Sequence, residues 1–170
     1  MRHYFVLQTM AVLQHSRVFN LIVAASNLYA LRAFNAWMPL DPICASLTAV
    51  AMGASTLYHL VERHKHGLAG CGSGSLREHT ICINIDRVAA VTLTLYILFN
   101  YPSIATRLLP SFAGALLMLG VSELPHLFPS VFQKHVGANA TRVIYTITHS
   151  AWHMWAFHNL FLVANAYINA

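Results

Sequence analysis

Apolar blocks of about 20 residues recur along this 170-residue chain and constrain its fold more than any other feature. A block of that length, as an α-helix, spans the hydrocarbon core of a bilayer. Charged residues make up only 9% of the chain, whereas soluble domains carry about 25%. The sequence therefore predicts an all-α fold, a polytopic transmembrane helical bundle that forms a single integral membrane domain over residues 1–170.

The apolar blocks predict five membrane spans with turn signals between them. They lie at about residues 17–31, 42–61, 81–99, 104–121 and 142–167. The fourth contains Pro110, so it is either a full span or a re-entrant segment. A glycine-rich polar loop is predicted over residues 62–80, and an interfacial loop with a short helix over residues 122–141.

Basic residues favour one side of these spans. If the spans alternate in direction, only Arg32 and Arg107 fall on one side, and eight fall on the other, namely Arg2, Arg17, Arg63, Lys65, Arg77, Arg87, Lys134 and Arg142. The positive-inside rule then places the N-terminus on the cytosolic or matrix-like side of the membrane. The rule does not say which cellular membrane this is. The chain has 10 Lys and Arg residues against 5 Asp and Glu, an excess that suits loops facing lipid headgroups, so we expect membrane lipids as partners. No basic run with interleaved aromatic residues indicates nucleic acid as a partner.

Two histidines lie four residues apart within the last apolar block. His149 and His153 share one face of the predicted helix, so both rings can reach one ion. A histidine in hydrocarbon is costly without a partner or a metal. A chain with 11 histidines contains about one such pair by chance, so hydrogen bonds to a neighbouring helix are the alternative interpretation.

Polar residues of two other spans are predicted at the same depth as this pair. Ser55 and His59 lie four residues apart near the positive end of the second span, and Asp86 lies near the start of the third. Taken singly, Ser55 could be a packing residue, and Asp86 could pair with Arg87 at the interface. Their agreement in depth with the last span predicts one shared site.

Three histidines with an open fourth position are typical of catalytic zinc. We therefore predict zinc as cofactor, with His59, His149 and His153 as its ligands. Zinc lowers the pKa of a bound water to about 7, and Asp86 could orient or deprotonate that water. Ser55 could assist by stabilising the developing oxyanion. Such a site suits a lipid whose amide or ester bond enters from the side.

The order Ser55-x3-His59, then Asp86, then His149-x3-His153 resembles the CREST superfamily of membrane hydrolases. That superfamily groups alkaline ceramidases, adiponectin/progestin-type receptors, Per1-like GPI-remodelling proteins and myomaker-related proteins. The strings Ser55–His59 and His149–His153 look closest to the myomaker and GPI-phospholipase branch. The resemblance covers about residues 43–163 and implies a seven-helix fold with zinc on the three histidines.

The chain departs from that family in length. Residues 87–148, between Asp86 and His149, leave room for one full span, so we expect a shortened relative of the seven-helix fold. Two functions follow as hypotheses. The first is a zinc-dependent intramembrane lipid hydrolase for a ceramide-type amide or a phospholipid or GPI ester. The alternative is a catalytically idle accessory subunit with a structural role among other subunits of a larger membrane complex, mitochondrial or otherwise organellar.

Overall fold

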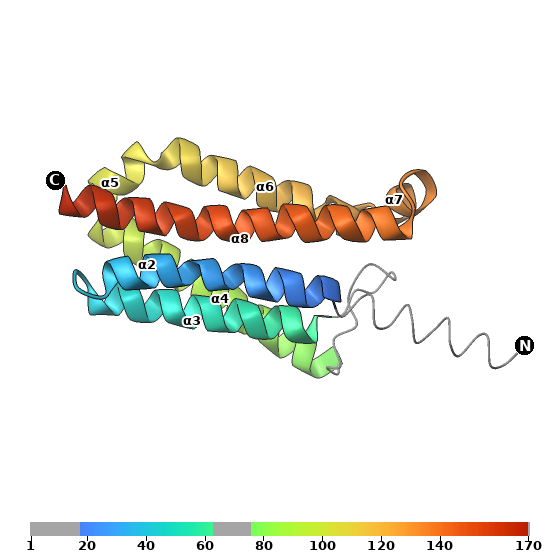
Figure 1. The fold of residues 1–170 in the computed structure, drawn as a ribbon, viewed down its shortest axis with the longest axis horizontal. Helices are drawn as coiled ribbons and strands as arrows, with labels where there is room; N and C mark the ends of the chain where they lie inside the picture. Colours follow the sequence, from blue (N-terminus) through green and yellow to red (C-terminus); the bar gives the residue numbers. More distant parts are fainter. Residues whose placement is uncertain (1–17, 63–75, 170) are drawn as a thin grey trace, which may run out of the picture.

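The computed structural model describes residues 18–62 and 76–169, and these ranges are almost entirely helical (Figure 1). A helix over residues 18–26 continues through a 3-10 turn, η1 (Asn27–Tyr29), into α2 (Ala30–Trp37). The remaining helices are α3 (Pro42–Val61), α4 (Leu76–Asn100), α5 (Pro102–Arg107), α6 (Leu109–Leu127), α7 (Pro129–His135) and α8 (Ala138–Ile168). The prediction of an all-α fold is confirmed.

The bounds of α3 match the predicted span at residues 42–61. The bounds of the other helices differ from the predicted spans. Residues 76–80, predicted as part of the polar loop 62–80, form the first turns of α4, where Glu78 is favourable beside the helix N-terminus. The segment 122–141, predicted as an interfacial loop, is mostly helical, and α7 is its short helix. Residues 1–17 and 63–75, including the start of the first span and most of the polar loop, lie outside the described residues.

The predicted fourth span is divided into α5 and α6. Pro110 lies in the first turn of α6, where a proline ring is tolerated because the backbone N–H it lacks has no helical partner there. The chain therefore breaks at Leu108, between the two helices.

Two helices in the described part of the chain are long and apolar enough to cross a membrane. They are α3 and residues 77–100 of α4, with mean hydropathies of 1.3 and 1.6. The predicted number of five spans is not confirmed. The last helix, α8, buries polar side chains such as His149, His153 and Asn159, and these residues lower its mean hydropathy.

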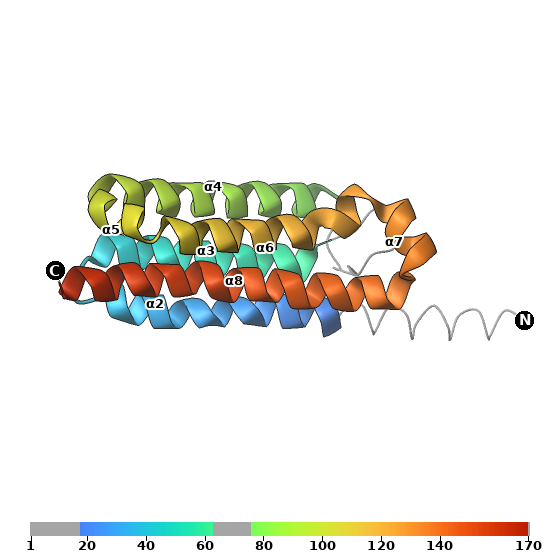
Figure 2. The same cartoon turned by 90° about the horizontal axis from the view of Figure 1, so that it is seen from above.

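The long helices form a row in which each packs on the next. Figures 1 and 2 show α8 running the length of the bundle, and the contacts connect α4 to α3, α3 to α2, α2 to α8, and α8 to α6. In the described residues, no Cα atom of α3 lies within 8 Å of a Cα atom of α8. Side chains must therefore make any link between α3 and α8.

Asp41 ties together the end of the bundle at which α3 begins. Its Oδ1 accepts from the backbone N–H groups of Ile43 and Cys44 at 3.0 and 3.1 Å, which caps the N-terminus of α3. Its Oδ2 accepts from the hydroxyls of Tyr96 and Tyr101 at 2.8 and 2.7 Å. Burial raises the pKa of Asp41, but these hydrogen bonds, that from Tyr101 foremost, outweigh burial and lower the pKa below its ordinary 3.8.

We expect Asp41→Asn to lower the melting temperature at pH 7, with a cost of about 1 kcal/mol for exchanging charge-assisted hydrogen bonds for neutral ones. Because the pKa is lowered in the folded state, the stabilisation is present above the ordinary value of 3.8 and is lost as the pH falls through the folded pKa. Thermal unfolding of both proteins between pH 7 and 3 should therefore show a difference that narrows below about pH 4. A difference independent of pH would contradict this role of the carboxylate.

A glycine brings α6 close to α8. A Cβ atom built on Gly114 would lie 2.7 Å from ring atoms Cη2 and Cζ2 of Trp155. The Trp155 indole N–H donates to Ser111 Oγ at 3.0 Å, and the Ser111 hydroxyl donates to Asn159 Oδ1 at 2.6 Å. The absence of a side chain at Gly114 therefore keeps a hydrogen-bonded chain intact between the two helices.

Gly114→Ala should displace the Trp155 ring and destabilise the fold by about 1–3 kcal/mol. Gly120→Ala is the matched control on the same helix, because a Cβ atom there meets nothing within 4 Å. The control should be neutral or more stable by up to about 1 kcal/mol, since alanine favours a helix over glycine. Thermal unfolding and Trp fluorescence measure both effects, and equal melting temperatures would contradict the packing role of Gly114.

Candidate metal centre

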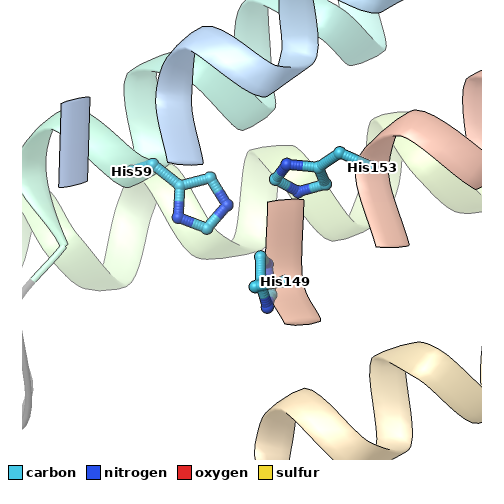
Figure 3. A group of neighbouring side chains, drawn as sticks. All are labelled: His59, His149 and His153. Atoms are coloured by element: carbon cyan, nitrogen blue, oxygen red, sulfur yellow. The ribbon is translucent and has the colours of Figure 1, made fainter. Parts of the chain in front are cut away.

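Three buried histidines meet between α3 and α8, toward the end of the bundle at which α3 ends. His59, His149 and His153 are 1%, 6% and 5% exposed. Each offers one ligand atom, and these three atoms lie within 4.8 Å of one another. The ring centroids are 4.8–4.9 Å apart, and Figure 3 shows the rings gathered in one space, one from α3 and two from α8.

Each histidine is held through its Nδ1 atom by a residue of a different segment. His59 Nδ1 lies 2.7 Å from Glu62 Oε2, just beyond α3. His149 Nδ1 lies 3.0 Å from Ser122 Oγ of α6, and 3.6 Å from Glu123 Oε1. His153 Nδ1 lies 2.9 Å from Ser26 Oγ, in the helix over residues 18–26. Three segments of the chain, namely the residue that follows α3, helix α6 and the first helix, therefore orient the three rings.

The two serines can only accept hydrogen bonds from their histidines. The Ser26 hydroxyl donates to the Val23 carbonyl at 2.6 Å, and the Ser122 hydroxyl donates to the Leu119 carbonyl at 2.7 Å. Because a hydroxyl has a single proton, the Nδ1–H groups of His153 and His149 must be the donors. A neutral imidazole that donates through Nδ1 carries its lone pair on Nε2.

The same direction of hydrogen bond follows for His59, whose Nδ1 lies 2.7 Å from a carboxylate oxygen. An ionised carboxylate only accepts, so His59 also donates through Nδ1, and its Nε2 atom is buried with no hydrogen-bond partner. Neutral imidazoles oriented by outer hydrogen bonds are the usual state of histidines that bind metal. The three residues therefore fit a metal ion and could hold one, as the sequence predicted for His59, His149 and His153.

Ser55 and Asp86, the predicted catalytic residues, lie beside this cluster. Ser55 Oγ is 3.4 Å from His153 Nε2, and the Ser55 hydroxyl is also hydrogen-bonded to the Asp86 side chain. Asp86 is half-buried on α4 and interacts electrostatically with His59. The fold thus brings all five predicted site residues together from α3, α4 and α8.

Sequence reasoning missed the residues that hold the imidazoles. Glu62 was assigned to the polar loop, although its spacing of three residues from His59 could have indicated a contact across one helical turn. Ser122 and Glu123 were assigned to the interfacial loop. For Ser26, on the first helix, we find no sequence signal that distinguishes it from a packing residue.

No protein-family model, no curated protein and no solved structure matches the chain.

The purified protein should contain about one transition-metal ion per chain, and substitution of a ligand should remove it. We expect His59→Ala, His149→Ala and His153→Ala each to lose most of the metal, because two imidazoles bind far less tightly than three. His158→Ala is the control on α8, since the His158 ring lies against Tyr29 and Phe161, outside the cluster. Elemental analysis of the folded proteins measures the metal content. A wild-type chain that stays free of metal even after incubation with zinc would contradict the proposal that the three histidines form a metal site.

Proposed function

We propose that this protein is a zinc-dependent hydrolase that cleaves an amide or ester bond of a membrane lipid. The observation that carries the proposal is the convergence of three buried imidazoles with a serine and an aspartate. Three nitrogen ligands favour zinc among the common metals. The resemblance to the CREST superfamily, stated above on these same residues, supports a hydrolase.

The zinc ion, when bound, would supply a Lewis acid that polarises the lipid carbonyl and makes water acidic at neutral pH. His59, His149 and His153 would hold it through Nε2. Their outer hydrogen bonds restrain the three rings, so little reorganisation would be needed on binding.

Asp86 is the residue to which we assign proton transfer. Its carboxylate would accept a proton from the attacking water and later deliver it to the leaving amine or alcohol, while the carbonyl carbon gains a C–O bond and loses the C–N or C–O bond. Ser55 lies between Asp86 and His153, so its hydroxyl can orient the carboxylate or donate to the developing oxyanion.

A lipid substrate is supported by the outer surface of the bundle. Large apolar side chains on α4 and α6 point outward, among them Val88 at 65%, Phe99 at 78% and Leu117 at 71% exposure. Such a surface is unfavourable in water and suits a bilayer. We propose that α3 and α4 cross the membrane together with the less apolar helices that pack on them, with the N-terminus on the cytosolic or matrix-like side.

The same apolar faces on α4 and α6 support the alternative function. In the described residues only α3 and α5 have Cα atoms within 8 Å of those of α4, so another subunit could pack on the outer face of α4. The protein would then be a catalytically idle accessory subunit of a larger membrane complex.

Turnover of defined lipids by the zinc-loaded protein tests the proposal. In vesicles that contain a ceramide or a phosphatidylcholine, the wild-type protein should release fatty acid. Asp86→Asn should lower the rate by about 100-fold or more, because it removes the general base, and Ser55→Ala by about 10-fold. Both variants should keep their zinc.

Ser46→Ala is the matched control, since Ser46 is an exposed serine of α3 whose hydroxyl donates to the Pro42 carbonyl. It should leave both turnover and zinc content unchanged. A zinc-loaded wild-type protein that releases no fatty acid and copurifies with a fixed set of membrane proteins would contradict the hydrolase and favour the accessory subunit. Equal rates for wild type and Asp86→Asn would contradict the role of Asp86.

A further inference from the structure

Glu62 is a buried carboxylate that accepts hydrogen bonds from both sides of the bundle. The residue is 2% exposed. Its Oε2 accepts from His59 Nδ1 at 2.7 Å, and its Oε1 accepts from the hydroxyls of Tyr58 and Tyr145 at 3.0 and 2.8 Å. Its backbone carbonyl accepts from Asn20 Nδ2 at 3.3 Å. A carboxylate out of water is stable only with such partners, so its position is determined by α3, α8 and the first helix together.

Through these contacts Glu62 determines where the free nitrogen of His59 points. The hydrogen bond through Nδ1 restrains the ring rotation and leaves Nε2, the atom that is buried without a partner, as the nitrogen available to a metal. The ring then lies with its centroid 4.9 Å from those of both His149 and His153.

The tyrosine on the other side of Glu62 comes from α8. Since no Cα atom of α3 lies within 8 Å of one of α8 in the described residues, side chains connect these helices. These connections include the hydrogen bond from Tyr145 to Glu62, the contact of Ser55 with His153, and the ring contacts of His59. One carboxylate therefore orients a ligand on α3 and is itself fixed from the helix that carries the other two ligands.

Glu123 has a weaker position beside the cluster. Its side chain is 42% exposed, and its Oε1 lies 3.6 Å from His149 Nδ1, which Ser122 Oγ contacts at the shorter distance of 3.0 Å. An exposed carboxylate at that distance restricts a ring less than a buried one at 2.7 Å.

We propose that Glu62 is the positioning residue of the metal centre, and that Tyr145 acts on the centre through it. The inference rests on the proposed metal site and adds a residue outside the ligand set. Metal affinity and the docking of α3 against α8 would then be coupled, because the same carboxylate serves both.

The test is a double-mutant cycle on zinc affinity, measured by chelator competition on the full chain in detergent or nanodiscs. Glu62→Gln should raise the zinc Kd by about 10- to 100-fold, the range for loss of an outer partner of a zinc-bound histidine. Tyr145→Phe should raise it by a smaller factor. The double variant should bind no more weakly than Glu62→Gln alone, because Tyr145 acts only through Glu62. Cobalt-loaded Glu62→Gln should also show an altered visible absorption spectrum.

Asp41→Asn is the matched control. Asp41 also accepts from two tyrosine hydroxyls, but at the opposite end of α3. It should lower the melting temperature of the metal-free protein and leave the zinc Kd unchanged. This separates the positioning role from a general loss of stability.

The outcomes distinguish the inference from the proposed function. A wild-type chain that binds no zinc overturns both. If the wild-type protein binds zinc and the zinc Kd of folded Glu62→Gln lies within about twofold of the wild-type value, the inference alone is overturned. Full additivity of the two substitutions in the cycle also overturns it. If Glu62→Gln does not fold, Tyr58→Phe and Tyr145→Phe replace it, since each removes a single hydroxyl, and an unchanged Kd in both overturns the inference.

Discussion

The interaction on which the rest of the structure depends is the meeting of three imidazoles between two helices whose backbones do not touch. A buried imidazole in an apolar bundle is costly unless hydrogen bonds or a metal satisfy its nitrogens. The Nδ1 partners of His59, His149 and His153 come from just beyond α3, from α6 and from the first helix. The centre therefore fixes the relative positions of most of the helices in the row, whereas apolar packing alone would allow them to rotate or slide.

Two buried or half-buried carboxylates then fix the ends of α3. Asp41 caps its N-terminus and accepts from tyrosines of the α4–α5 end, and Glu62 follows its last residue and accepts from Tyr58 and Tyr145. Small buried residues such as Ala45, Ala51 and Ala54 line the helix between these points. They permit close approach but do not specify register. Polar groups at both ends supply the register that the small residues cannot.

The sequence predicted α3 well because Asp41-Pro42 is a strong helix start. It predicted that His59, His149 and His153 come together, because spacing within one helix and order along the chain are both readable. It could not predict Ser26 or Ser122, since an outer partner depends on which helices are neighbours. The predicted number of spans is not confirmed, for a related reason. Helix α8, which carries two of the three clustered histidines, also buries Thr146, Ser150 and Asn159. A helix with that many polar residues no longer has the hydropathy by which a span is recognised.

The two kinds of outer partner have a common explanation in helix geometry. Ser26 and Ser122 lie inside helices, where a serine hydroxyl can donate to the carbonyl three residues earlier. That bond uses the only proton, so each serine becomes a fixed acceptor for a histidine of α8.

His59 lies near the end of α3, and Glu62 there has left helical geometry, with ψ at 128°. The chain turns away at that point, and a side chain three residues later can reach back to the ring. A helix interior thus favours serine as the hydrogen-bond acceptor for a histidine on a neighbouring helix. A helix end permits a carboxylate as the acceptor for a histidine of the same helix. Only the second arrangement leaves an oxygen that a residue of α8 can also reach.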